Sequence, residues 1–307
     1  MSAPSRIGIV GTGRAARALA AALGRSLPEG ALCVWGRNET GAREIAQRVG
    51  AVHADAPEDL LARAEVLLLA VRDDAVTEVA ARLARALEPG RGAACEVALH
   101  LAGAVPATAL APLAARGMSC GVFHPVVALV DETSAARLAG ATATVSGDPR
   151  ARAAAVALAR RLGMVALEVR DEARAAVHLA CVMAAGDVVT LLGLAEELLA
   201  GAGVAADDAR RLLAALARSA ADAFESCGAA GGLTGPVPRG DAATLARHRD
   251  ALPDEGEAGA VHRALTASRL LLADGGRVKV CGFGHARRME RSDRPIRSGR
   301  ATHRVRI

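Results

Sequence analysis

Residues 6–16 read Arg-Ile-Gly-Ile-Val-Gly-Thr-Gly-Arg-Ala-Ala. A short apolar run from Ile7 to Val10 ends at Gly11-Thr12-Gly13, and an alanine- and leucine-rich segment follows from Arg14 to Leu23. The order of strand, glycine turn and helix is typical of the first unit of a dinucleotide-binding fold.

Each small residue of the GxGxxA pattern has a physical role in such a unit. Gly11 permits the tight turn, Gly13 lets the backbone approach a pyrophosphate, and Ala16 lets helix and strand pack closely. The phosphates then bind at the N-terminus of the helix, where the backbone N–H groups of Arg14, Ala15 and Ala16 are free. The alternative is a purely structural turn, because an alanine-rich chain with 32 glycines matches this pattern by chance.

The end of the second expected strand, Ala31–Trp35, is where such folds select their cofactor. NAD-binding forms place an acidic residue here for the ribose 2′-hydroxyl, whereas an arginine accepts the 2′-phosphate of NADP. This chain has Gly36-Arg37-Asn38, which favours NADP(H), although Glu39 follows and Arg37 could be an ordinary surface arginine.

Strands and helices alternate up to about residue 170. A buried strand at Glu65–Val71 leads into Arg72, the strand Cys95–Leu101 leads into Gly103, and the strand Met118–Phe123 leads into His124. This alternation predicts an α/β fold with a Rossmann-type, doubly wound, mostly parallel sheet, whose ligands bind at the carboxyl ends of the strands. Further helices are expected at 40–49, 106–116 and 149–162, and further strands at 52–53, 141–146 and 164–169.

The pattern changes after Asp171, where only helical stretches are found, at 172–200, 206–226, 242–252 and 257–273. The five glycines and two prolines of the intervening segment 227–240 predict a loop without helix, and Asp241 is placed to cap the next helix. We therefore expect a dinucleotide-binding domain at 1–171, an all-α domain at 172–274, and a basic, disordered tail at 275–307.

Composition excludes several classes of protein. The tail carries ten basic and two acidic residues, so the remaining chain has a net charge of −3. Because the whole chain has only four aromatic residues, we expect no nucleic-acid surface apart from nonspecific contact by the tail. The six cysteines form no CxxC pair, which excludes a metal site of that kind and predicts a cytoplasmic protein with reduced thiols. The apolar segment Ala175–Ala195 contains Asp187, which favours a buried helix of a soluble domain over a membrane span.

Phe123-His124-Pro125, His178 and the stretch Thr234-Gly-Pro-Val-Pro-Arg-Gly-Asp241 resemble the bacterial proteins that join a Rossmann-like domain to domain of unknown function 2520. The chain is more distantly similar to pyrroline-5-carboxylate reductase and the 6-phosphogluconate dehydrogenase-like superfamily. The resemblance implies a helical domain like that of 6-phosphogluconate dehydrogenase, and it implies a homodimer. It also implies an NADP oxidoreductase, but it does not specify the substrate. One departure is Ala185-Gly186, where the resemblance implies a Ser-Asn pair.

The single lysine, Lys279, lies in the expected tail, and tyrosine is absent. This excludes the lysine-dependent mechanisms of hydroxyacid and 6-phosphogluconate dehydrogenases and the Tyr-Lys pair of short-chain dehydrogenases. His124 is the first candidate for a proton donor, or else it only hydrogen-bonds its loop. His178 faces the same cleft if the resemblance holds, or is an interior histidine, and His100 is a further strand-end histidine.

Thr234, Arg239 and Asp241 complete the candidate site. Arg239 could hold a substrate carboxylate with its guanidinium, and Asp241 could support catalysis by holding the loop, or both could be a helix cap beside a solvated arginine. We expect the cofactor to contact Gly11, Thr12, Gly13, Arg14, Ala15, Ala16, Gly36, Arg37, Asn38, Val71, Arg72 and Gly103.

Two classes of function remain. One is an NADP(H)-dependent oxidoreductase acting on a small carbonyl or imine that binds between the two expected domains. The other is a non-catalytic NADP(H)-binding sensor or partner-binding protein, because a fold alone does not determine function.

Overall fold

The computed structural model describes residues 4–87, 95–252 and 256–273. It divides into two compact units, residues 1–189 and 190–307. The expected basic tail, 275–307, lies outside the described residues. The unit boundary falls inside a helical run, eighteen residues after the domain boundary expected from sequence at 171.

The first unit is built on one eight-stranded sheet in the order β3-β2-β1-β4-β5-β6-β7-β8. All neighbouring strands are parallel except β6 and β7, so the mostly parallel, doubly wound sheet predicted from sequence is confirmed. The strands are β1 Ile7–Val10, β2 Leu32–Trp35, β3 Val52–His53, β4 Val66–Leu69, β5 Val97–His100, β6 Ser119–Val126, β7 Thr142–Gly147 and β8 Val165–Glu168.

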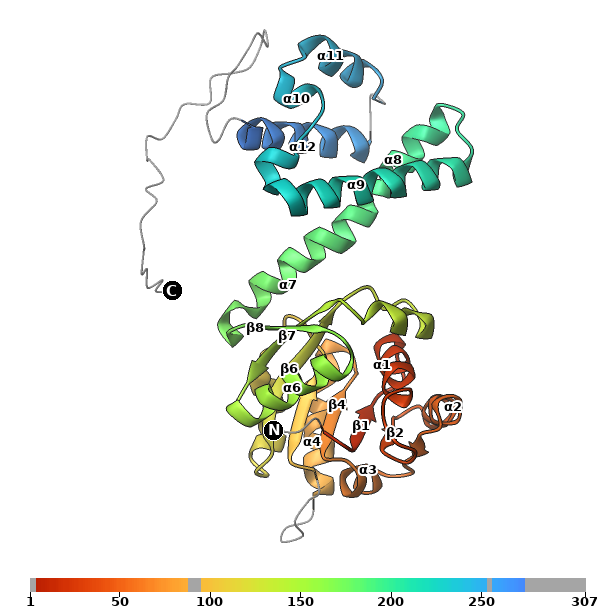
Figure 1. The fold of residues 1–307 in the computed structure, drawn as a ribbon, viewed down its shortest axis with the longest axis vertical. Helices are drawn as coiled ribbons and strands as arrows, with labels where there is room; N and C mark the ends of the chain where they lie inside the picture. Colours follow the sequence, from red (N-terminus) through yellow and green to blue (C-terminus); the bar gives the residue numbers. More distant parts are fainter. Residues whose placement is uncertain (1–3, 88–94, 253–255, 274–307) are drawn as a thin grey trace, which may run out of the picture. The chain divides into compact units, whose positions relative to one another are not determined.

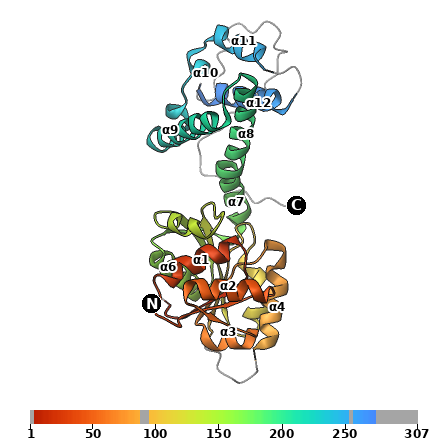
Figure 2. The ribbon, with the colours of Figure 1, turned by 90° about the vertical axis from the view of Figure 1, so that its right-hand side faces the viewer.

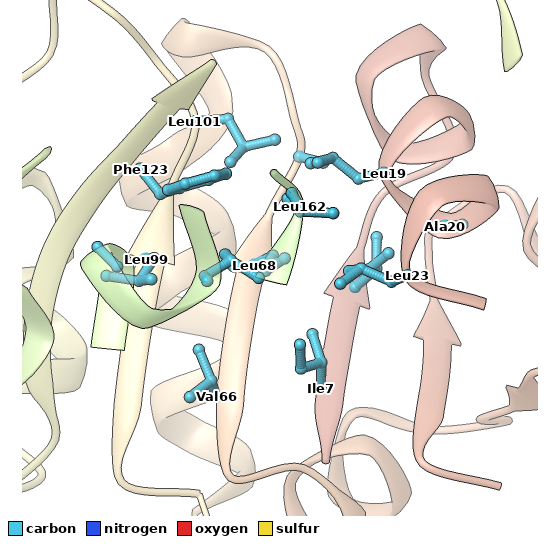
Figure 3. Close-up of a cluster of buried hydrophobic side chains, with 14 of the residues drawn as sticks. Ile7, Leu19, Ala20, Leu23, Val66, Leu68, Leu99, Leu101, Phe123 and Leu162 are labelled. Carbon is cyan, nitrogen blue, oxygen red and sulfur yellow. The ribbon is translucent and has the colours of Figure 1, made fainter. Parts of the chain in front are cut away.

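Helices cover both faces of this sheet (Figure 1). Helices α1 (Arg14–Gly24), α2 (Glu39–Val49) and α6 (Pro149–Arg161) bury their apolar faces in one cluster with Ile7 and Leu68, which Figure 3 shows from α1 to the central strands. On the other face, α3 (Pro57–Arg63), α4 (Val76–Ala86) and α5 (Ala111–Ala114) enclose a second aliphatic cluster. Short 3-10 segments lie at Asp73–Ala75 (η1), Ala107–Leu110 (η2), Glu132–Arg137 (η3) and Asp171–Ala173 (η4).

Two expectations for this unit need correction. Helix α3 was not anticipated; Pro57 at its first turn and Leu60 and Leu61 facing the core account for it. The single helix expected at 106–116 is instead η2 followed by α5. Pro112 lies in the first turn of α5, where a proline is tolerated, and it cannot donate an N–H to a continuous helix.

A long helical run, labelled α7 and α8 in Figure 2, crosses the unit boundary. It comprises α7 (Arg174–Val182), a π-helical segment at Met183–Asp187 (η5) and α8 (Val188–Gly201). The buried helix expected at 175–195 is not observed, because no residue of that stretch is buried within the chain. Among the described residues, Asp171–Gly201 is the one helix whose length and mean hydropathy of 1.9 would allow a membrane crossing.

The second unit continues with α9 (Ala206–Gly232), α10 (Pro236–Arg239), α11 (Ala242–Asp250) and α12 (Glu257–Ala273). Segment 227–240 was expected to contain no helix, and α10 and the end of α9 correct this. The expected end of regular helix near residue 227 nonetheless agrees with the structure, since Gly228 has a φ of 67° that interrupts α9. Prolines are compatible with α10 because Pro236 occupies its first turn, where no N–H is needed.

Candidate functional site

The candidate residues of the first unit gather at one edge of the sheet. Gly11, Arg37, Arg72 and Gly103 follow the ends of β1, β2, β4 and β5, and His124 lies two residues before the end of β6. These five strands are parallel, so their carboxyl ends share an edge. Strand order reverses between β1 and β4, which is where ligands bind in open sheets of this kind.

The two glycines of the first turn have different surroundings. Gly11 has a φ of 119°, and a Cβ there would lie 2.4 Å from the carbonyl oxygen of Ala70, so the turn itself requires glycine. A Cβ on Gly13 would meet nothing within 4 Å. Helix α1 begins directly after Gly13 with no side-chain cap and no acidic residue in its first turn. Its N-terminal N–H groups are thus suited to bind an anion.

A cleft of about 260 Å³ opens beside this turn. Eight of the twelve residues predicted to bind the cofactor line it: Gly11, Thr12, Gly13, Gly36, Arg37, Asn38, Val71 and Arg72. The other four do not: Arg14, Ala15 and Ala16 form the first turn of α1, where Ala16 is buried against the core, and Gly103 lies with the histidines described below. Five apolar residues that were not predicted from the sequence also line the cleft: Val10, Trp35, Ala70, Ala75 and Val79.

The arginines of the cleft are paired with carboxylates from the chain after β4. Arg72 donates to both oxygens of Asp74, at 3.1 and 2.6 Å. Arg37 Nη1 lies 3.8 Å from Glu78 Oε1, and both side chains are exposed. Asn38 accepts a hydrogen bond from the N–H of Gly41 at 3.0 Å and so caps α2. Guanidinium groups therefore face the cleft, but none of the three side chains is without a partner.

Gly103, His124 and His178 lie together at the same edge of the sheet. The imidazole rings of His124 and His178 are 5.6 Å apart between centroids and inclined at 66°. A Cβ on Gly103 would lie 2.2 Å from Cδ2 of His178 and 2.8 Å from Nε2 of His124. Glycine at 103 thus leaves the space that the two rings occupy, and neither histidine lines the 260 Å³ cleft.

The hydrogen bond of His124 to the backbone shows which ring nitrogen carries the proton. Its Nδ1 lies 2.8 Å from the carbonyl oxygen of Leu101, which can only accept, so Nδ1 carries the hydrogen and Nε2 of the neutral ring is an acceptor. Burial lowers the pKa of His124 below 6.5; the hydrogen bond to Leu101 opposes this shift, while His178 and Arg174 add to it. At neutral pH the ring is therefore mainly uncharged.

A buried polar group that the sequence analysis missed lies behind this pair. Arg174, 1% exposed, donates from Nη1 to Ser146 Oγ at 3.1 Å and from Nη2 to Thr144 Oγ1 at 3.4 Å. Ser146 in turn donates to Asp171, whose second oxygen accepts the N–H of Ala107 at 3.0 Å. These bonds fix the start of α7, one helical turn before His178, against β7.

His100 belongs to the interior rather than to an exposed strand end. It is fully buried, and its Nε2 lies 3.2 Å from the carbonyl oxygen of Pro106. Burial lowers its pKa from 6.5 to about 4, with the hydrogen bond to Pro106 acting against the shift. We therefore assign it a structural role, as a neutral ring that binds the Pro106 carbonyl.

Thr234, Arg239 and Asp241 lie in the second unit. The Asp241 carboxylate accepts the N–H of Thr244 at 3.0 Å on one oxygen and the Thr244 hydroxyl at 2.7 Å on the other. It caps α11 as expected, and these hydrogen bonds, with Arg239 and Arg247 nearby, lower its pKa. Among the residues that the structure describes, no group of three His, Cys, Asp or Glu side chains could hold a metal ion.

Two protein families match the chain. Residues 6–91 match the family described as NADP oxidoreductase coenzyme F420-dependent, and residues 141–269 match domain of unknown function 2520. The resemblance drawn from the residues around His124, His178 and Asp241 is therefore confirmed.

Solved structures share the fold over nearly the whole chain. Protein TM1727 of Thermotoga maritima has a TM-score of 0.65 at 20% identity, with 88% of this chain and 98% of that chain covered. A reductive aminase of Aspergillus terreus, in complex with NADPH and ethyl levulinate, has a TM-score of 0.64 at 19% identity and 89% and 95% coverage. A Plasmodium falciparum pyrroline carboxylate reductase with NADP bound has a TM-score of 0.59 at 10% identity and 90% and 97% coverage. No curated protein sequence matches the chain.

Proposed function

We propose that the protein is an NADP(H)-dependent oxidoreductase that reduces a small carbonyl or imine. The observation that carries the proposal is the cleft at the switch point of the sheet, with Arg37 at the end of β2 where an acidic residue would select NAD. The NADP(H)-bound reductive aminase and pyrroline carboxylate reductase of the same fold support this choice of cofactor and of substrate class.

The residues present fit such a cofactor. The uncapped N-terminus of α1 and the open space over Gly13 suit the pyrophosphate, and Arg37 suits the 2′-phosphate. Trp35 and Val79 line the same cleft with apolar surface for the adenine. NADPH supplies the hydride when it is bound; the protein provides binding, orientation and the proton.

His124 is our candidate for the proton donor. Reduction of a carbonyl or imine adds a proton to the heteroatom, and the described residues contain neither lysine nor tyrosine to provide it. Because Nδ1 is bound to Leu101, protonation of His124 places the transferable proton on Nε2, which faces Gly103 and His178. Arg239 is our candidate for binding a negatively charged substrate group, with Asp241 holding its loop through the α11 cap.

A specific observation favours the second candidate function, a non-catalytic NADP(H)-binding sensor. The lowered pKa of His124 leaves most molecules with a single imidazole proton at pH 7, and that proton is hydrogen-bonded to Leu101. A protein that only binds the cofactor does not need a charged histidine at this edge.

The affinities for NADPH and NADH test the cofactor assignment. The parent protein should bind NADPH more tightly than NADH, and Arg37→Glu should reverse or abolish that preference, because a carboxylate repels the 2′-phosphate. Equal affinities in the parent, or no loss of NADPH affinity in the variant, would contradict the assignment. Following NADPH oxidation with small keto acids, aldehydes and cyclic imines then separates an enzyme from a sensor.

A further inference from the structure

The pairing of Arg37 with Glu78 has a consequence for cofactor choice. Arg37 follows β2 and Glu78 lies in the first turn of α4, which follows β4, while β1 lies between those two strands. Arg37 and Val79, the neighbour of Glu78, both line the cleft. The ion pair therefore joins the two sides of the cleft at the place where Arg37 would receive a phosphate.

We propose that Glu78 is a specificity-determining residue, whose carboxylate competes with the 2′-phosphate of NADP(H) for Arg37 and so reduces the preference for NADPH over NADH. This inference rests on the proposed function. Glu78 was not identified from the sequence, because it lies about forty residues beyond the β2 end that usually sets cofactor choice.

The charge and exposure of the two side chains indicate that the Arg37–Glu78 ion pair is weak enough for a 2′-phosphate to replace Glu78. The atoms are 3.8 Å apart and the side chains are 63% and 73% exposed, so the pair is weak and readily exchanged. A 2′-phosphate is doubly charged near neutral pH and matches the guanidinium fork better than a single distant carboxylate oxygen. Binding of NADP(H) must displace Glu78 and also place two like charges near each other. NADH, which has a ribose hydroxyl at this position, pays neither cost.

A second arginine of the cleft, Arg72, is also paired with a carboxylate. Arg72, on the same cleft, holds Asp74 through two hydrogen bonds at 3.1 and 2.6 Å. Arg72 and Asp74 are two residues apart in the sequence and are joined by two hydrogen bonds. Arg37 and Glu78 come from different elements and approach each other through one pair of atoms. Arg37 is thus the arginine whose partner can change without local rearrangement of a turn.

Titration of NADPH and NADH into the full-length protein and Glu78→Gln tests the proposal. Loss of an exposed ion pair corresponds to about a two- to fivefold change in affinity, so Glu78→Gln should bind NADPH about two- to fivefold more tightly at low ionic strength. NADH affinity should not rise. The gain should shrink as salt is raised to about 0.15 M, where the screening length is about 8 Å.

Glu39→Gln is the matched control. Glu39 lies two residues from Arg37, and its removal changes the net charge equally, but its carboxylate is paired with Arg43 at 2.6 Å. Its NADPH-to-NADH affinity ratio should remain near the parental value. In an Arg37→Gln background, Glu78→Gln should change the ratio less than it does in the parent, since the competition for Arg37 is gone and only the repulsion between Glu78 and the 2′-phosphate remains.

The outcomes distinguish the two proposals. An unchanged ratio in Glu78→Gln, or an equal shift in Glu39→Gln, overturns the competition while leaving NADP(H) binding intact. Failure of the parent to bind either nucleotide overturns the proposed function, and the competition with it. Melting temperatures of all variants should stay near the parental value, because both side chains are exposed.

Discussion

Gly103, His124 and His178 lie together at one edge of the sheet, and the position of each depends on the other two. Glycine at 103 makes room for the two rings, and the Leu101 carbonyl orients His124. Arg174 holds the first turn of α7 through Thr144 and Ser146, a contact that brings His178 to the pair. His124 and His178 could be singled out from sequence. Arg174 could not, because one arginine among many carries no signal of burial.

At this scale we predict the effect of His124→Asn. If His124 donates the proton, kcat should fall about 10²–10⁴-fold while NADPH affinity stays nearly parental. The protonated fraction of His124 falls as pH rises through its lowered pKa, which lies below 6.5, so the parental rate should fall with rising pH. The variant should lose this dependence. Turnover of any substrate at the parental rate by His124→Asn would refute the assignment.

At the scale of elements, the turn between β1 and α1 contains one glycine that the fold requires and one that we assign to cofactor binding. Gly11 is required by its left-handed φ and by the Ala70 carbonyl, whereas the space over Gly13 is open. The sequence pattern predicts both glycines equally well, because each role depends only on the local order of strand, turn and helix. In the same way the helix expected at 257–273 coincides with α12, and Asp241, expected to cap the helix after the glycine- and proline-rich segment, caps α11.

Longer-range features could not be predicted in that way. Helix α3 lacks a long apolar period, and the antiparallel entry of β7 beside β6 leaves no mark in a short strand. The π-helical segment Met183–Asp187 reads in sequence as ordinary helix. Glu78 meets Arg37 only through the sheet order, so the candidate site was predicted along its strand ends and missed on its α4 side.

The two glycines yield a paired prediction. Gly11→Ala should destabilise the first unit by at least about 1–3 kcal/mol, since alanine is strained at a φ of 119° and its Cβ collides with Ala70. Gly13→Ala should keep the melting temperature within a few degrees of the parent's but weaken NADPH binding about 10- to 100-fold. The added methyl group would hold the pyrophosphate away from the N–H groups of α1, an effect comparable to the loss of a hydrogen bond to a charged group. Thermal unfolding and NADPH titration measure both. Unimpaired NADPH binding in Gly13→Ala would mean that the pyrophosphate lies elsewhere.

For the whole molecule, exposed apolar side chains in each unit are the basis on which we propose a homodimer. In the first unit Leu179, Val182 and Met183 follow helical spacing and are 59%, 40% and 58% exposed. In the second unit Leu212 and Leu216, one turn apart on α9, are 52% and 64% exposed. Surfaces of this kind mark interaction sites in proteins that remain in solution. A second copy of the chain is the partner we expect, as the sequence analysis did.

Sedimentation of the parent and of two α9 variants tests this expectation. The parent should sediment as a dimer at micromolar concentration. Leu216→Glu should raise the dissociation constant about 100-fold or more, because a symmetric dimer loses two buried leucines at about 1.5 kcal/mol or more each. Ala221→Glu adds the same charge on the opposite side of α9, about half a helical turn from Leu212, and should remain dimeric. A monomeric parent would exclude the dimer. Equal dissociation of the two variants would show that added charge, rather than loss of the Leu216 face, separates the subunits.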